Sequence, residues 1–358
     1  MNTPLHPRIL WLKTFCQKHP RWINTILVMV SIGFVVSVCE TGFRLYIRTT
    51  DPILATAIQR FAWEAAHEDT KSRFVPHPYL SYAPRSIEYK NGGIQIRDQY
   101  FAFQKPEGTL RIACLGGSTT MEQYPLVLTD AVKARLGETQ AVEVMDFGCD
   151  GWTLIESTLN YMLRIADFSP DYVIVHHGAN DIAGRLWPNY KPDFTHYRKH
   201  YEERWLGWFS RKYLSFSWMV TSLLHRSGMS SVDILNLTTH TVPYETLNTE
   251  YEPQTLYPFE KYFQVLFLLC QVQQSHLIYM PMAYCAEKKD YFDLALIESF
   301  NQSGRRIAKE LSIPVVEAGP LLQGRPELFK DVVHLTPEGN QIKAQLLADT
   351  IASIEKNP

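Results

Sequence analysis

Residues 112–119 read IACLGGST, a short apolar run that ends in two glycines and two hydroxyl-bearing residues. An apolar run of about four to eight residues bounded by turn-forming residues is typical of a buried strand. Gly116 and Gly117 permit a sharp turn of the backbone, which leaves Ser118 at the head of the next segment. The stretch therefore predicts a strand followed by a tight turn into a helix.

The rest of the chain continues this alternation of strand-length apolar runs and helical segments. Further apolar runs of strand length lie at residues 142–147, 172–176, 277–280 and 314–317. Segments with helical periodicity lie at residues 128–136, 154–165, 259–274, 294–311 and 338–354. Strands without polar alternation, each followed by a helix, indicate a parallel sheet covered on both faces. We therefore expect an α/β domain of three layers over residues 108–355.

The N-terminal segment is of a different kind. No charged side chain occurs between Ile23 and Cys39. At about 1.5 Å rise per residue, roughly 20 residues cross the hydrocarbon core of a bilayer. The residues before this run include four basic ones, Arg8, Lys13, Lys18 and Arg21. By the positive-inside rule, the sequence predicts a cytoplasmic tail at 1–21, a single transmembrane anchor at 22–46, and an extracytoplasmic remainder.

Two other interpretations of this segment are weaker. A cleaved secretory signal is disfavoured because a long tail precedes the apolar run and no A-x-A-like site follows it. Residues 36–39 resemble a lipidation signal only weakly, because Val38 is larger than the residue that normally precedes a lipidated cysteine.

The overall composition excludes some classes of protein. The 358 residues are 46% hydrophobic and carry 35 basic and 37 acidic side chains, a formal net charge of −2. This balance does not fit a nucleic-acid binder, and the apolar content does not fit a disordered chain. The six cysteines show no spacing of a metal site, although one disulfide stays open among those after the anchor.

Two segments depart from the α/β rhythm. Residues 47–107 begin with a short helical pattern at 54–66 and continue as a loop-rich stretch, which predicts a spacer and an N-terminal appendage. Residues 182–258 form an insertion whose first part, residues 185–218, is dense in aromatic residues with basic residues interleaved. That insertion can pack as an extra helical layer, cover the substrate or bind sugars, or lie on an anionic membrane surface.

In an open parallel sheet, ligands bind beyond the carboxyl ends of the strands. The first three strands lead into the loops Gly116–Thr119, Gly148–Thr153 and His177–Asp181. Backbone N–H groups at such turns, with an amide side chain, can stabilise an oxyanion. By itself, Ser118 could equally cap a helix or the turn could cradle a phosphate. Neither a Walker A motif nor a G-x-S-x-G elbow is present.

The last loop is more specific. Asp331 and His334 are three residues apart, just before a helix that Thr336 and Pro337 are suited to begin. A carboxylate that orients an imidazole, which in turn reaches a hydroxyl, is what activates a serine. A single D-x-x-H motif is weak evidence for a catalytic site. The three loops described above and this fourth one, taken together and in this order, point to a single site.

On these residues the chain resembles the SGNH (GDSL-type) hydrolase family, over about residues 108–352. The matching blocks are Gly116–Thr119, Gly151 in Asp150–Thr153, Gly178–Asp181 and Asp331–His334. Gly117 stands where the family signature has an aspartate. Gly148 is a rival to Gly151 in the second block, although it fits the family pattern less well.

The resemblance implies a flavodoxin-like, three-layer fold and a set of residue roles. Ser118 would be the nucleophile, His334 the base and Asp331 its orienter. The oxyanion hole would consist of the backbone N–H groups of Ser118 and Gly151 and the side chain of Asn180. His176 and His177, beside the third loop, are expected to support the core or the site without acting in catalysis.

The implied function is a membrane-anchored serine esterase that needs no metal or organic cofactor and binds no nucleic acid. Its substrate would be an O-acyl group of a glycan, a lipid or another small ester. A sugar hydroxyl in place of water would make it an O-acetyltransferase. The alternative of another class is a non-catalytic glycan-binding or assembly protein on the same fold.

Overall fold

The computed structural model describes residues 20–52, 55, 58–59, 73–186, 193–194, 217–226, 256–288 and 294–356. Nearly all of the predicted tail at 1–21, and most of the predicted helix at 54–66 and of the insertion at 182–258, lie outside these residues. The chain forms two compact units. One comprises residues 1–69 and 203–238, and the other comprises residues 70–202 and 239–358.

The larger unit is built on a parallel sheet with the strand order β7-β6-β8-β9. Its strands are β6 (Thr109–Gly116), β7 (Ala141–Asp146), β8 (Tyr172–His176) and β9 (His276–Tyr279). The strand β6 pairs with both β7 and β8, which puts its carboxyl end at the middle of the sheet. Four of the predicted strands are thus confirmed.

The prediction of a fifth strand at 314–317 is wrong. This segment makes only an isolated parallel bridge, between Val315 and Tyr279. Its backbone pairs with Tyr279 through the carbonyl of Pro314 and the N–H of Val316. Pro314 has no N–H to extend the ladder, and the chain enters helix α12 (Gly319–Leu322) directly afterwards.

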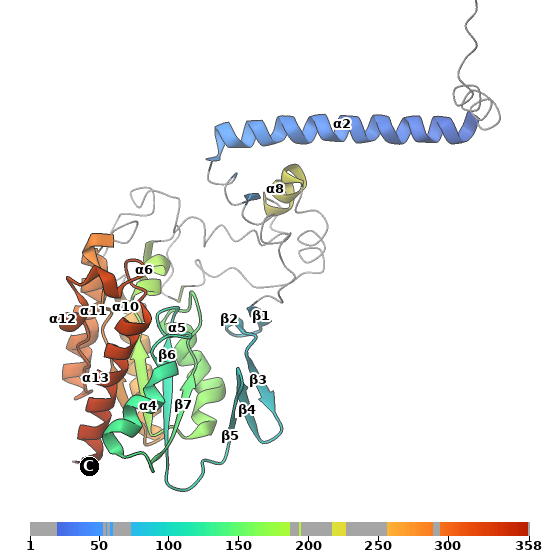
Figure 1. The fold of residues 1–358 in the computed structure, drawn as a ribbon. Coiled ribbons are helices and arrows are strands. Elements are labelled where there is room, and N and C mark those ends of the chain that lie inside the picture. Colours follow the sequence, from blue (N-terminus) through green and yellow to red (C-terminus); the bar gives the residue numbers. More distant parts are fainter. Residues whose placement is uncertain are drawn as a thin grey trace, which may run out of the picture. The chain divides into compact units, whose positions relative to one another are not determined.

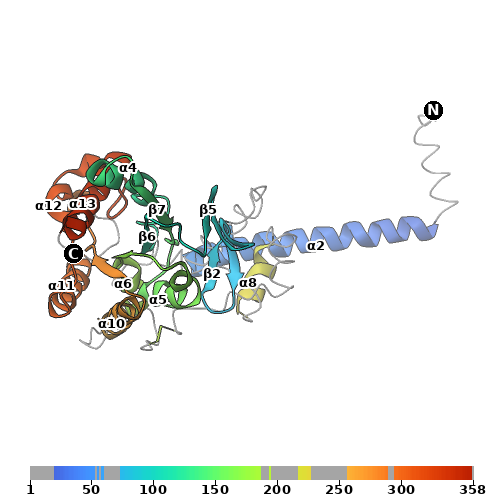
Figure 2. The ribbon, with the colours of Figure 1, turned by 90° about the horizontal axis from the view of Figure 1, so that it is seen from below.

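Helices cover both faces of the sheet (Figures 1 and 2), which confirms the three-layer α/β fold. One face packs on α4 (Pro125–Leu136) and α13 (Pro337–Lys356). The other packs on α5 (Leu154–Asn160), α10 (Tyr257–Val272) and α11 (Leu294–Glu310). The shorter elements are α6 (Ala179–Leu186), the π-helical η1 (Tyr161–Ile165), and the 3-10 turns η2 (Ala166–Phe168), η6 (Ala286–Lys288) and η7 (Pro326–Leu328).

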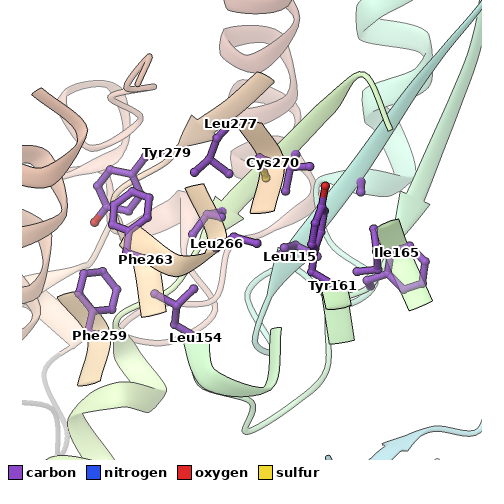
Figure 3. Close-up of a cluster of buried hydrophobic side chains, with 14 of the residues drawn as sticks. Leu115, Leu154, Tyr161, Ile165, Phe259, Phe263, Leu266, Cys270, Leu277 and Tyr279 are labelled. Atoms are coloured by element: carbon purple, nitrogen blue, oxygen red, sulfur yellow. The ribbon is translucent and has the colours of Figure 1, made fainter. Parts of the chain in front are cut away.

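Two aromatic side chains of α10, Phe259 and Phe263, lie in one core cluster (Figure 3). Phe263 is fully buried, and its ring centroid lies 5.0 Å from that of Tyr279 on β9. Phe259, one turn earlier, packs edge-on against Phe300 of α11 at 5.3 Å. The period of about 3.6 residues therefore puts the apolar stripe of α10 against the sheet.

Replacing Phe263 by alanine should lower the free energy of unfolding by about 3–5 kcal/mol, because the lost ring leaves a cavity in a close-packed core. Val272 at the end of the same helix is 79% exposed. Val272→Ala should therefore change the free energy of unfolding by less than about 0.5 kcal/mol. Urea denaturation followed by circular dichroism measures both. Equal effects of the two substitutions would contradict the described packing of α10.

The prediction that the stretch before residue 108 is loop-rich is wrong. It contains the hairpin β1 (Phe74–His77) and β2 (Ser81–Pro84), followed by an antiparallel sheet of β3 (Ile87–Lys90), β4 (Gly93–Ile96) and β5 (Gln99–Ala102). Asn91 and Gly92, with φ of +79° at the glycine, form the turn between β3 and β4. An Asn-Gly pair between alternating apolar residues is a hairpin signal. The buried side chains of Ile94, Ile96 and Phe101 show that alternation.

The smaller unit contains the N-terminal apolar helix α2 (Pro20–Thr50). The segment Asn24–Thr50 is long and apolar enough to cross a membrane, and an 18-residue window within it reaches a mean hydropathy of 2.1. The helix continues past the predicted end of the anchor at 46. A short helix, α8 (Trp218–Arg226), packs on its second half, where Arg44 and Arg48 lie over the Trp218 ring.

Glu40, the first charged residue after the apolar run, holds α8 in place. Its carboxylate accepts hydrogen bonds from the Ser217 hydroxyl at 2.9 Å and the Trp218 backbone N–H at 2.6 Å. It also accepts one from Arg44 at 2.8 Å. A carboxylate at a helix N-terminus satisfies N–H groups that lack partners inside the helix. Residues 217–226 of the predicted insertion are therefore bound to the apolar helix.

Candidate active site

The structure brings Ser118 together with His334 and Asp331, which lie more than 200 residues further along the chain. Ser118 Oγ is 2.7 Å from His334 Nε2. His334 Nδ1 is 2.7 Å from Asp331 Oδ2. Both distances are those of good hydrogen bonds. The predicted serine, imidazole and carboxylate are thus joined by two successive hydrogen bonds beyond the carboxyl end of β6.

Gly116 and Gly117 precede Ser118. Because they have no side chains, neighbouring groups can pack directly against the backbone of this turn. A Cβ atom on Gly116 would lie 2.8 Å from the backbone oxygen of His176. A Cβ atom on Gly117 would lie 2.3 Å from Asn180 Nδ2. Glycine at 117, where the family signature has aspartate, therefore lets the Asn180 amide approach the serine loop closely.

Asp331 is fixed by its own backbone turn. Its Oδ1 accepts hydrogen bonds from the N–H groups of Val333 at 3.0 Å and His334 at 2.8 Å. Burial acts to raise the pKa of Asp331, but the hydrogen bonds from the His334 side chain and from these N–H groups lower it to about 2. An ionised Asp331 can only accept, so His334 Nδ1 is the donor. His334 Nε2 is then free to accept the Ser118 proton.

The predicted oxyanion donors lie beside the serine loop. Asn180 Nδ2 donates a hydrogen bond to the backbone oxygen of Trp152 at 2.9 Å, which ties the third loop to the second. Gly151 adopts φ of +75°, a conformation that favours glycine. Within the described residues, the N–H groups of Ser118 and Gly151 donate to no protein acceptor. They are thus available to a negatively charged oxygen.

Gly148 and Gly151 differ in the hydrogen bonding of their backbone N–H groups. The Gly148 N–H donates to Asp146 Oδ1 at 3.0 Å, so it is not available to a substrate. A Cβ atom on Gly148 would lie 2.4 Å from the Met121 backbone nitrogen, which explains the glycine by close packing. Of the two glycines, only Gly151 has a backbone N–H without a protein acceptor among the described residues.

The two histidines beside the third loop belong to separate buried networks. His176 Nδ1 contacts the backbone oxygen of Met280, and its Nε2 is 2.8 Å from Lys343 Nζ. Burial lowers the pKa of Lys343 to about 7. His177 Nε2 contacts the Ser157 hydroxyl at 2.7 Å. Sequence reasoning missed Lys343, because a lysine in an amphipathic helix is normally assigned to the solvent face.

Sequence reasoning also missed a contribution from the appendage. The hydroxyl of Tyr82, on β2, donates to the backbone oxygen of Asp150 at 2.6 Å. Arg73 lies between the carboxylates of Glu122 and Asp150, at 3.3 and 3.4 Å. Nothing in the local sequence signals these contacts, since they join residues about 50 to 80 positions apart. The second loop is therefore partly held by residues outside the α/β domain.

No cluster of three or more potential metal ligands occurs among the residues that the structure describes. The cysteines in those ranges are free thiols, at positions 39, 114, 149, 270 and 285.

Comparison with known proteins identifies one family. The model of the GDSL-like lipase/acylhydrolase family matches residues 114–342, a range that includes all five predicted site residues but not Tyr82. No curated protein matches the chain.

Solved structures with a similar arrangement include a GDSL-like lipase from Bacteroides thetaiotaomicron, 17% identical, with a TM-score of 0.41 over 68% of this chain and 88% of that one. A lipase/acylhydrolase from Enterococcus faecalis is 13% identical, with a TM-score of 0.43 over 68% and 96%. An acetylxylan esterase from Geobacillus stearothermophilus is 15% identical, with a TM-score of 0.42 over 68% and 94%.

Proposed function

Since the chain belongs to the GDSL-like lipase/acylhydrolase family, we propose that it is a membrane-anchored serine esterase with Ser118 as its nucleophile. The observation that carries this proposal is the relay from Ser118 through His334 to Asp331, with both contacts at 2.7 Å. A scaffold protein has no physical need for a serine aimed at an imidazole that a carboxylate orients.

In the proposed reaction, His334 Nε2 removes the proton of Ser118 as its oxygen attacks the ester carbonyl. The carbonyl oxygen becomes negatively charged and accepts hydrogen bonds from the N–H groups of Ser118 and Gly151 and from Asn180. His334 then protonates the leaving alkoxide. The acyl group is now esterified to Ser118 Oγ. His334 deprotonates a water molecule as that water attacks the acyl carbonyl, and it then returns the proton to Ser118 Oγ as the Oγ–acyl bond breaks and the acid leaves. Asp331 stabilises the imidazolium formed in each half of the reaction.

The membrane part of the proposal rests on α2. Its apolar run lacks charges up to Glu40, and basic residues concentrate before it. Both features favour a span with a cytoplasmic N-terminus. The catalytic residues then lie outside the cytoplasm, where O-acyl groups of a glycan, a lipid or another small ester are the proposed substrates.

The test uses the full chain in detergent with p-nitrophenyl acetate, butyrate and octanoate, beside Ser118→Ala. We expect turnover that depends on Ser118, with one preferred chain length set by the acyl pocket. Adding a carbohydrate acceptor separates hydrolysis from transfer, because a transferase forms more acylated sugar than free acid. Hydrolysis no faster than that of Ser118→Ala on every ester would overturn the proposal and favour a non-catalytic protein.

A further inference from the structure

We infer that Tyr82, on the N-terminal hairpin, is a positioning residue for the oxyanion donor Gly151. The inference rests on the proposed function, because it assigns a role in stabilising the oxyanion of that reaction. Tyr82 lies outside the range that matches the family model. Tyr82 contacts the loop Asp150–Trp152, which follows β7 and lies beside the Ser118 loop.

Tyr82 and Gly151 are linked through one peptide unit. The Tyr82 hydroxyl donates to the backbone oxygen of Asp150 at 2.6 Å. That carbonyl and the Gly151 N–H belong to the same peptide bond, which is trans, since the structure contains no cis peptide bonds in its described residues. In a trans peptide the C=O and N–H groups point in opposite directions. Fixing the carbonyl of Asp150 therefore fixes the direction of the Gly151 N–H.

The same hydrogen bond also affects the strength of the donor. A carbonyl that accepts a hydrogen bond polarises its amide, and hydrogen bonds in such chains reinforce one another. The Gly151 N–H thus becomes a better donor when Tyr82 holds the carbonyl. Oxyanion donors that are aligned before the reaction need no reorganisation in the transition state.

Tyr82 and Gly151 also fit closely against each other. A Cβ atom on Gly151 would lie 2.6 Å from the Tyr82 hydroxyl oxygen. Gly151 also has φ of +75°, so any other residue would be strained and would displace the hydroxyl. The absence of a side chain at position 151 is therefore what allows Tyr82 to reach the peptide.

Tyr82 is itself held in place by its neighbours. The Trp152 indole N–H donates to the backbone oxygen of Tyr82 at 3.2 Å. The Tyr82 ring packs edge-on against Phe74 of β1 at 5.4 Å. Trp152 is fully buried in a cluster with Leu80, Ala83 and Cys149. The hairpin and the Asp150–Trp152 loop are thus bound to each other through both backbone and side chains.

The test is Tyr82→Phe in the full chain, which removes only the hydroxyl and keeps the ring on Phe74. Tyr79→Phe is the matched control, because Tyr79 lies in the same hairpin and is 70% exposed. We measure kcat and KM for p-nitrophenyl acetate, the inhibition constant of a trifluoromethyl ketone that forms an oxyanion on the serine, and the melting temperature. All assays are run well below the melting temperature of both variants.

We expect Tyr82→Phe to lower kcat about tenfold, less than the loss of a direct oxyanion donor, with KM nearly unchanged. The trifluoromethyl ketone should bind more weakly by a similar factor, because it uses the same donors. A lower melting temperature with kcat equal to that of Tyr79→Phe would overturn the role of Tyr82 and leave the proposed function intact. A wild-type chain no more active than Ser118→Ala would overturn both.

Discussion

Ser118→Ala should lower kcat for p-nitrophenyl acetate by about 10³-fold or more, because no other group replaces the attacking oxygen. The structure gives the hydroxyl a hydrogen bond to His334 Nε2 at 2.7 Å. Removing it leaves the oxyanion donors and the substrate site in place, so KM and the melting temperature should change little. Steady-state kinetics and thermal unfolding of the same preparation measure these quantities.

A second serine provides a matched control. Ser157 contacts the ring of His177 at the same distance, 2.7 Å, but it is fully buried. Ser157→Ala removes a similar serine–histidine contact away from any substrate, so it should retain most of the activity. Equal losses in Ser118→Ala and Ser157→Ala would mean that the fall in activity reflects general damage and not the loss of a nucleophile.

Asp331→Asn should lower kcat by about 10²- to 10⁴-fold, although the substitution changes only one atom. The backbone N–H groups of Val333 and His334 hold Oδ1 as an acceptor, so the new amide nitrogen would take the place of Oδ2. It would donate to His334 Nδ1 and force the proton onto Nε2. His334 could then no longer accept the proton of Ser118, and the negative charge that stabilises the imidazolium would be lost.

The control for this substitution is Asp349→Asn, which removes a carboxylate that pairs with Arg135 at the surface. That variant should keep full activity, since surface ion pairs contribute about 1 kcal/mol or less to stability. Kinetics on p-nitrophenyl acetate across the neutral pH range measure both variants. Full activity in Asp331→Asn would show that Asp331 does not orient His334.

The residues of the candidate site could be predicted because each lies in a local pattern. Ser118 follows a buried strand and two glycines, and Asp331 and His334 share one turn before a helix. Such short-range features determine the loop at the end of each strand. The order of the strands in the sheet depends on pairing between distant segments, so chain order alone did not predict that β6 lies between β7 and β8.

The features that the sequence did not predict depend on hydrogen bonds and contacts with other parts of the chain. The segment at 314–317 is apolar like a strand, but Pro314 cannot donate, and pairing ends after one bridge. The strands β3–β5 are short, and their alternation was outweighed by the polar and glycine residues around them. The choice between Gly148 and Gly151 depended on a hydrogen bond to Asp146. The hydrogen bond of Tyr82 to Asp150 spans 68 positions of the chain, and no local pattern signals such a contact.

The most direct test of the proposed nucleophile is covalent labelling with a fluorophosphonate, which reacts with activated serines, followed by mass spectrometry of the digested protein. We expect one phosphonyl group on Ser118, slower labelling in Asp331→Asn, and no labelling in Ser118→Ala. Labelling of a different residue, or equal labelling of the wild type and Ser118→Ala, would contradict the assignment of Ser118 as the nucleophile.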